Sequence, residues 1–371
     1  MTLPLTPLAA SLPATVPFVG PEAMERARGR PFAARLGANE SPFGPSPRAL
    51  EALREGAGEA WMYGDPEAFE LRRALAERHG VPMEAIVVGA GIDGLLGDLV
   101  RLVVGPGDPV ATSLGAYPTF AYHVRGHGGR LHAVPYRGEH EDTDALARTA
   151  RETGARLVYL ANPDNPMGSW HGAEAVAALL ARLPEGTLLA LDEAYADTAP
   201  EGAIPPLDAG DPRVIRLRTF SKAHGLAGLR IGYAVAHPDL IGAFDRVRLH
   251  FGVARPAQGA ALASLGDEAH LAATVARIAE GREGIAAIAR ASGLAPLPSA
   301  TNFVAVDCGG DGAFARSVME GLLARGVFVR MPGVAPLDRC VRISAGRAED
   351  LARLASALPE ALAQARAATS P

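Results

Sequence analysis

The chain has 371 residues, of which 48% are hydrophobic and 21% charged, and its net charge is −5. This composition is typical of a soluble protein with a sizeable core, and the length favours two lobes or a large α/β domain with a smaller one attached. The acidic balance, with arginines spread along the chain, argues against a surface that binds nucleic acid or an anionic membrane. The two cysteines, Cys308 and Cys340, form no CxxC pair, so we expect no metal site, no disulfide framework and a cytoplasmic location.

The first twenty residues are fairly apolar but are interrupted by Pro4, Pro7, Pro13 and Pro17. The first arginine is Arg26, so the basic start of a secretory signal is missing, and we expect no signal peptide. No apolar run approaches the length of a membrane span. The Pro- and Gly-rich segment Asn39–Pro47 predicts an irregular connector near the start of a large domain.

Short β-branched or aliphatic runs alternate with stretches of helical period between about residues 70 and 250. The seven expected strands are Ala85–Gly89, Asp108–Ser113, Arg130–Tyr136, Arg156–Ala161, Thr187–Asp192, Val214–Arg218 and Leu229–Ala236. Several are continuously hydrophobic, as expected of strands that are covered on both faces. The alternation predicts a mostly parallel, doubly wound, seven-stranded sheet.

Beyond about residue 255 the pattern changes to long Ala-rich helical stretches, followed by short strands and a final helix from Ala348. The expected strands are Thr301–Asp307, Val327–Arg330 and Cys340–Ser344. We predict an N-terminal arm over residues 1–45 that contributes to a small domain, a large domain over 46–255 and a small C-terminal α/β domain over 256–371.

Lys222 is the only lysine in the chain; the other 35 of its 36 lysine and arginine residues are arginines. An arginine guanidinium stays protonated and cannot act as a nucleophilic amine, whereas a lysine amine can form an imine with an aldehyde or ketone. An arginine-biased composition that left one lysine by chance is the alternative. The surrounding segment, Thr219–Arg230, favours a Schiff-base lysine. Further polar residues also follow expected strands, where α/β sheets bind ligands: Asn162, Asn165, Asp192 and Ser221.

Three segments, in this order and spacing, resemble the fold-type I pyridoxal-phosphate aminotransferases: Asn162–Gly168 (NPDNPMG), Asp192–Tyr195 (DEAY) and Ser221–Arg230 (SKAHGLAGLR). The segment Gly37–Pro47 is similar to the opening of the histidinol-phosphate aminotransferase group, and the resemblance runs from about Pro17 to Arg347. It implies pyridoxal 5′-phosphate as the cofactor and the aminotransferase fold, with a large cofactor-binding domain and a smaller α/β domain.

The resemblance also implies the residues that hold the cofactor. Lys222 forms the imine and moves the proton at the substrate's Cα. Asp192 faces the pyridine nitrogen, Asn165 and Tyr195 donate to the phenolic oxygen, and Tyr117 stacks on the ring. The phosphate is bound by Ala90 and Gly91 at a helix start, by Ser221 and Arg230, and by Tyr63 of the neighbouring subunit of a homodimer. The structural alternatives are turns or caps for Asp192 and Asn165 and ordinary packing for the tyrosines.

Four residues are implied to contact the substrate. Arg342 matches the arginine that binds a carboxylate, and Arg330 matches a second arginine that binds a substrate phosphate; the alternative is a surface arginine. Asn39 lies in the N-terminal motif, and Phe18 stands where the group usually has tyrosine. Ile92 replaces a common serine at the phosphate, and Met167 and Ser344 each stand where threonine is common.

These residues predict an aminotransferase that moves an amino group between an amino acid, such as glutamate, and an oxo substrate, with histidinol phosphate as the leading candidate. Phe18 would favour substrates with aromatic side chains, so aromatic or other amino acids remain alternative substrates. A related decarboxylase, such as threonine-phosphate decarboxylase, uses similar cofactor residues. Ligand-sensing regulators with this fold carry an N-terminal DNA-binding domain, whereas the resemblance here begins near residue 17.

Overall fold

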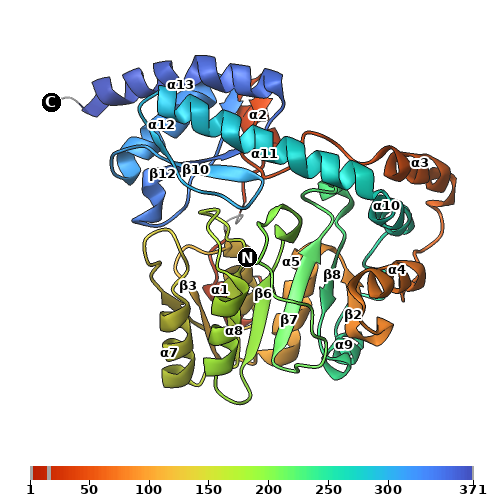
Figure 1. Cartoon of the computed structure of the whole chain (residues 1–371). Coiled ribbons are helices and arrows are strands. Elements are labelled where there is room, and N and C mark those ends of the chain that lie inside the picture. Colours follow the sequence, from red (N-terminus) through yellow and green to blue (C-terminus); the bar gives the residue numbers. More distant parts are fainter. Residues whose placement is uncertain (1–2, 15–17, 370–371) are drawn as a thin grey trace.

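A computed structural model describes residues 3–14 and 18–369 (Figure 1). Pro17, near which the family resemblance begins, lies outside the described residues. The larger part of the fold is a seven-stranded sheet of order β2-β8-β7-β6-β5-β3-β4. Its strands are β2 (Ile86–Gly89), β3 (Pro109–Ser113), β4 (Arg130–Val134), β5 (Leu157–Ala161), β6 (Leu188–Asp192), β7 (Val214–Thr219) and β8 (Gly232–Val235).

The sheet is mostly parallel, as predicted, because β8 alone among its strands runs antiparallel to both neighbours. The expected strand Leu229–Ala236 is shorter in the structure. A 3-10 turn occupies Ala227–Leu229, and Arg230 has a left-handed backbone with φ of 51°, which interrupts the extended chain before Gly232.

Helices cover both faces of this sheet, which confirms the doubly wound architecture. One face packs against α5 (Gly91–Val103), α6 (Pro118–Gly126) and α9 (Pro238–Ala243). The other packs against α7 (Thr143–Thr153) and α8 (Ala173–Arg182) and, nearer β2 and β8, against α3 (Pro47–Gly56), α4 (Phe69–His79) and α10 (Arg255–Leu265). In β5 alternate residues enter opposite cores, so every side chain of the strand is buried.

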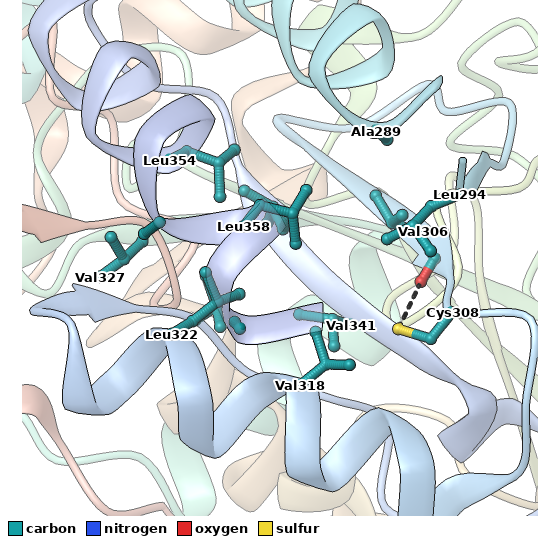
Figure 2. Packing of buried hydrophobic residues seen from close by; sticks show 14 of the residues in the cluster. Ala289, Leu294, Val306, Cys308, Val318, Leu322, Val327, Val341, Leu354 and Leu358 are labelled. Carbon is teal, nitrogen blue, oxygen red and sulfur yellow. Dashed lines mark hydrogen bonds between the residues drawn. The ribbon is translucent and has the colours of Figure 1, made fainter. Parts of the chain in front are cut away.

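A second layer lies above the carboxyl ends of the parallel strands (Figure 1). In its three-stranded antiparallel sheet, β10 (Phe303–Asp307) lies between β9 (Ala295–Pro296) and β12 (Cys340–Ser344). The long helices are α11 (Glu268–Ala291), α12 (Gly312–Ala324) and α13 (Ala348–Thr369). Figure 2 shows part of their core, which includes Leu322 from α12, Leu354 and Leu358 from α13, and Val341 from β12.

The N-terminal segment joins this second layer, since β1 (Ala34–Arg35) pairs in parallel with β11 (Val327–Phe328). β11 ends before Arg330, which instead forms an isolated bridge with Arg342. The domain boundaries at residues 45 and 255 stay predictions; α10, directly after residue 255, packs with the helices of the seven-stranded sheet.

Shorter elements complete the described fold. They are the helices α1 (Pro7–Ser11) and α2 (Pro21–Arg28) and the 3-10 turns Ala57–Glu59, Met83–Ala85, Ala196–Thr198, Ala227–Leu229, Phe244–Arg246 and Leu337–Arg339. None of the helices in the described part of the chain is long and apolar enough to cross a membrane.

Candidate active site

A cavity of about 720 Å³ lies beyond the carboxyl ends of β5, β6 and β7. This volume suits a small-molecule site, and its position is where α/β sheets bind ligands. Of the predicted site residues, those that line it are Phe18, Tyr117, Asn165, Asp192, Tyr195, Ser221, Lys222 and Arg230. Within the described ranges, no group of three or more His, Cys, Asp or Glu side chains is placed to hold a metal ion.

Asp192 is the last residue of β6 and is only 5% exposed. Its Oδ2 accepts a hydrogen bond from the Tyr159 hydroxyl at 2.7 Å, and its Oδ1 accepts one from the Ala194 amide at 3.0 Å. Burial raises the pKa of Asp192 to about 6, against the lowering effects of these hydrogen bonds and of Lys222. The side chain is therefore a carboxylate at neutral pH, in a position where an unpaired negative charge is costly.

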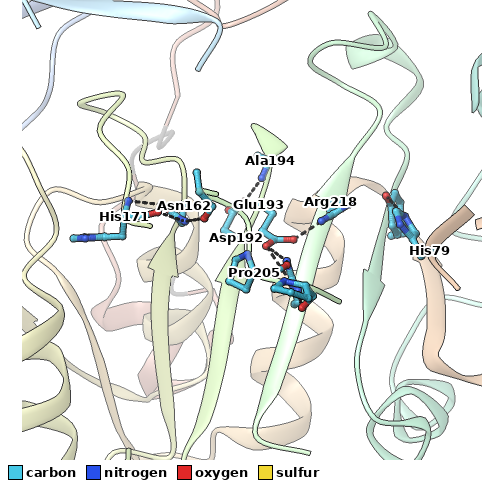
Figure 3. A network of polar contacts seen from close by, with 12 residues as sticks. His79, Asn162, His171, Asp192, Glu193, Ala194, Pro205 and Arg218 are labelled. Carbon is cyan, nitrogen blue, oxygen red and sulfur yellow. Dashed lines mark hydrogen bonds and ion pairs between the residues drawn. The ribbon is translucent and has the colours of Figure 1, made fainter. Parts of the chain in front are cut away.

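A buried ion network fixes the chain directly after Asp192 (Figure 3). The Glu193 side chain has no exposed surface, and its carboxylate accepts from Arg216 Nε at 3.0 Å and from Arg218 Nε at 2.9 Å. Arg216 also donates to the carbonyl oxygens of Pro205 and Pro206 at 2.8 and 2.7 Å. Sequence reasoning missed this network, because arginines two apart in a strand resemble a solvated face.

Lys222 follows β7 and is half-buried, with its Nζ donating to the carbonyl oxygen of Asn39 at 3.1 Å. Burial and, to a lesser extent, the guanidinium groups of Arg342 and Arg230 together lower the pKa of Lys222 to about 8, against the opposing effect of Asp192. A substantial fraction of the amine is therefore neutral near pH 8, as a nucleophile or base requires.

Asn39 connects three parts of the site. Its backbone has a left-handed φ of 55°, which asparagine tolerates better than most residues. Its Nδ2 donates to the Tyr195 hydroxyl at 2.9 Å, and its Oδ1 accepts from Ser344 Oγ at 3.1 Å. We predicted a substrate contact for Asn39, but its side-chain amide already bonds protein groups, and its carbonyl oxygen meets Lys222.

The start of α5 and Arg230 come together at one end of the cavity. Ala90 is the N-cap of this helix, and Gly91 begins it with a left-handed φ of 73°. A Cβ at Gly91 would lie 2.8 Å from Arg230 Nη2, and the left-handed φ would strain any other residue, so both the contact and the backbone favour glycine here. The free amides of a helix N-terminus beside a guanidinium suit an anion. Ser221 lies nearby in the cavity wall, where its Oγ accepts from Thr219 Oγ1 at 2.9 Å.

The two predicted substrate arginines are adjacent, because the Arg342 amide donates to the Arg330 carbonyl at 2.6 Å. Arg342 Nη1 donates to Asn165 Oδ1 at 2.5 Å, and its buried Nε has no hydrogen-bond partner among the described residues. The Arg330 guanidinium lies 4.2 Å above the Phe18 ring and donates to the Val19 carbonyl at 2.9 Å. An orphaned donor on Arg342 indicates that the site accommodates an acceptor from outside the chain.

Two predicted tyrosines differ in their surroundings. Tyr117 lines the cavity and donates to Asp93 Oδ1 at 3.3 Å. Tyr63 lies outside the lining of its own chain's cavity, is 74% exposed, and stacks on Phe251 with ring centroids 4.5 Å apart. The roles assigned to these side chains toward a cofactor or substrate stay predictions.

The family described as aminotransferase class I and II matches this chain over residues 34–358. The chain therefore belongs to that family. Among curated relatives, histidinol-phosphate aminotransferase 1 of Nitrosococcus oceani is 38% identical over 348 residues, 93% of each chain. The histidinol-phosphate aminotransferase of an Anaeromyxobacter species is 38% identical over 362 residues, covering 96% of this chain and 98% of the relative.

A solved structure extends the similarity to the whole fold of this family member. The crystal structure of histidinol-phosphate aminotransferase from Sinorhizobium meliloti, in complex with pyridoxal-5′-phosphate, is 55% identical. It superposes with a TM-score of 0.95 and covers 98% of both chains. The predicted family and fold type are thus confirmed.

Sequence reasoning missed several cavity residues, of which Tyr159 has the closest contact with a predicted one. The others include Glu40, Asp93, Thr119, Tyr122 and His123. A signal for Tyr159 was present: it is the one polar side chain in the strand Leu157–Ala161, three residues before Asn162. A buried tyrosine hydroxyl needs a hydrogen-bond partner, so its partner could have been sought at the same strand ends.

Proposed function

We propose that this chain is a pyridoxal-phosphate-dependent aminotransferase that acts on histidinol phosphate, with glutamate and its oxo acid as the other substrate pair. The observation that carries the proposal is the convergence of Lys222, Asp192 and Arg230 on one cavity. The names of the relatives support the substrate, and the ligand of the Sinorhizobium meliloti enzyme supports the cofactor.

The donor set of the cavity fits pyridoxal phosphate. The start of α5 with Arg230 and Ser221 would hold the phosphate, and Asp192 would face the ring nitrogen. Asn165 and Tyr195 would face the phenolic oxygen, and Tyr117 the ring. When bound, the cofactor supplies an electron sink that stabilises negative charge at the substrate's Cα. The ionised Asp192 strengthens that sink by keeping the ring nitrogen protonated.

Lys222 carries the proton transfer. Its amine would hold the cofactor in the resting enzyme and, when free, would act as the base toward the substrate's Cα. The lowered pKa, about 8, would let the amine accept the Cα proton near physiological pH as a base and then donate it again as an acid. Asn39, through its carbonyl oxygen, orients the amine.

Arg342 and Arg330 would bind the anionic ends of the substrates. The orphaned Arg342 Nε is suited to a carboxylate such as that of glutamate. Arg330 forms no ion pair with any carboxylate of the described residues, so its charge is available to a phosphate. The Phe18 ring beneath Arg330 holds the guanidinium in place by a cation–π contact but supplies no hydroxyl.

The test is a panel of donors and acceptors with the purified protein and added cofactor. Histidinol phosphate with 2-oxoglutarate should give the highest kcat/KM, with glutamate as the product. Arg330→Ala should lower kcat/KM for histidinol phosphate more than for an aromatic amino acid. A preference for aromatic amino acids, or release of carbon dioxide without amino transfer, would reject histidinol phosphate and favour one of the alternatives.

We further propose a homodimer in which Tyr63 reaches the partner's cofactor phosphate. The proposal is supported by four large apolar side chains that are exposed in the single chain. Trp61, Tyr63, Leu249 and Phe251 are 82%, 74%, 76% and 53% exposed, respectively. Such a group indicates a protein contact. An active species that sediments as a monomer would reject the shared site. The cytoplasmic location stays a proposal that rests on composition alone.

A further inference from the structure

We propose that Tyr159 is a positioning residue for Asp192: its hydroxyl holds the Asp192 carboxylate ionised and aimed at the ring nitrogen of the cofactor. The inference rests on the proposed function, in which Asp192 faces that nitrogen. Tyr159 acts here through Asp192, by the hydrogen bond between its hydroxyl and the Asp192 carboxylate.

Strand register brings the two side chains together. Tyr159 on β5 is paired with Ala190 on β6, and Ala161 with Asp192. Side chains two apart on a strand share a face, so Tyr159 points to the same face as Asp192 and reaches it diagonally. The resulting hydrogen bond, 2.7 Å from Oη to Oδ2, lies within the usual range for a hydroxyl donor and an oxygen acceptor.

The ring of Tyr159 is held in place by its surroundings. Tyr159 has no exposed surface, and its ring stacks on Phe120 with centroids 4.5 Å apart and planes 16° apart. Stacked aromatic rings in a packed core move little, so the position of the Tyr159 hydroxyl relative to Asp192 is fixed. Burial and the nearby Asp192 raise the pKa of Tyr159 well above its ordinary value, so the hydroxyl remains a donor at every working pH.

Asp192 depends on such a donor because burial favours its neutral form. The titratable and charged groups that act on it are Tyr159 on β5, Asp93 on α5, Lys222 after β7, Tyr117, Tyr195, Glu141 and Asp164. Of these, Lys222 and Tyr159 stabilise the carboxylate, and Asp93 destabilises it. Once Lys222 carries the cofactor its ammonium no longer faces Asp192. The Tyr159 hydroxyl and the Ala194 amide are then the donors to Asp192 that the described chain retains.

The test compares Tyr159→Phe with Tyr136→Phe in the cofactor-loaded enzyme. Tyr136 is a matched control, because this half-buried tyrosine also donates its hydroxyl to an aspartate, with 2.9 Å between Oη and Asp164 Oδ1. The readouts are the cofactor absorbance as a function of pH and the acidic limb of the kcat profile. In Tyr159→Phe, the acidic midpoints of the absorbance titration and of the kcat profile should each rise by about one pH unit. In Tyr136→Phe, both midpoints should stay where they are in wild type.

A second substitution guards against misfolding. Tyr159→Met places a flexible apolar side chain without a donor at the same position, and it should give the same upward shift. Unchanged acidic midpoints in the folded variants would overturn the role of Tyr159, as would an equal shift in Tyr136→Phe.

Asp192→Asn separates this inference from the proposed function. If Asp192→Asn retains wild-type turnover, another residue faces the ring nitrogen and the proposed cofactor arrangement fails. If Asp192→Asn loses more than ~10²-fold in kcat while Tyr159→Phe matches wild type, the inference about Tyr159 alone fails. In the Asp192→Asn background, Tyr159→Phe should lower kcat no further, because its effect acts through the carboxylate.

Discussion

Glu193→Gln should be among the most destabilising single-atom changes in this protein. The carboxylate lies between Arg216 and Arg218, and the exposed fractions of the three side chains are 0%, 4% and 17%, respectively. The substitution preserves shape and removes one charge. It also replaces an acceptor by an amide N–H₂, so one guanidinium then faces a donor instead of an acceptor.

The expected loss in the free energy of unfolding follows from this burial. Removing one partner of a buried ion pair costs about 3–5 kcal/mol, because the remaining charge stays in a region of low dielectric. Arg216 retains the carbonyl oxygens of Pro205 and Pro206, which places the estimate near the lower end, at about 3 kcal/mol. Stabilities of whole domains are only about 5–15 kcal/mol, so the loss is large.

Urea unfolding of the cofactor-free protein measures it, with Asp144→Asn as the control. Asp144 also pairs with an arginine, Arg182, but the side chains are 57% and 40% exposed, so solvent screens the pair and the expected loss is much smaller than for Glu193→Gln. Glu193→Gln should also weaken cofactor binding, since Glu193 anchors the chain next to Asp192. A Glu193→Gln protein that unfolds at the same urea concentration as the control would refute the argument.

Three further substitutions test the site. Lys222→Arg keeps the charge but should lower kcat by several orders of magnitude, and borohydride reduction with peptide mapping should label Lys222 in wild type and no arginine in the variant. Gly91→Ala should raise the cofactor Kd about tenfold more than Gly154→Ala does; both positions have φ above 60°, but only at Gly91 does a Cβ meet Arg230. For Asp192→Asn the pH dependence of stability is the readout: burial raises the pKa of Asp192 from 3.8 to about 6, so the cofactor-free wild type loses stability as pH rises through that interval. Between pH 4 and pH 8, the difference in free energy of unfolding between the variant and wild type should therefore change in favour of the variant by up to about 3 kcal/mol. A pH-independent difference would contradict this.

Local patterns sufficed for much of the fold. The strand Cys340–Ser344 and the helix that begins at Ala348 lie where the sequence predicts them, because each is set by a hydrophobic period within a few turns or residues. The expected strand Val327–Arg330 is wrong at its end: Arg330 leaves β11 and bridges to Arg342, a partner that no local pattern specifies. Boundaries that depend on distant pairing are therefore the ones that the sequence misplaces.

The same distinction separates the predicted site residues from the missed ones. Lys222 and Asp192 carry chemistry that few other side chains can perform, so their types and positions at strand ends reveal them. Tyr159 and Glu193 act through contacts, and a tyrosine within an aliphatic strand or a glutamate after an aspartate has many ordinary explanations. Their significance arises only when β5, β6 and β7 lie side by side.

Asn39 extends this reasoning to the assembly of the whole site. It bonds Ser344, 305 residues away, and Tyr195, 156 residues away, while its carbonyl oxygen accepts from Lys222. The Lys222 amine is therefore oriented by a residue that is itself held between the two layers of the fold. A change that separates these layers should disturb the proton-transferring amine even where every cofactor contact on the seven-stranded sheet is intact. The catalytic geometry is thus a property of the closed pair of layers, and the motifs in the sequence supply only its chemical groups.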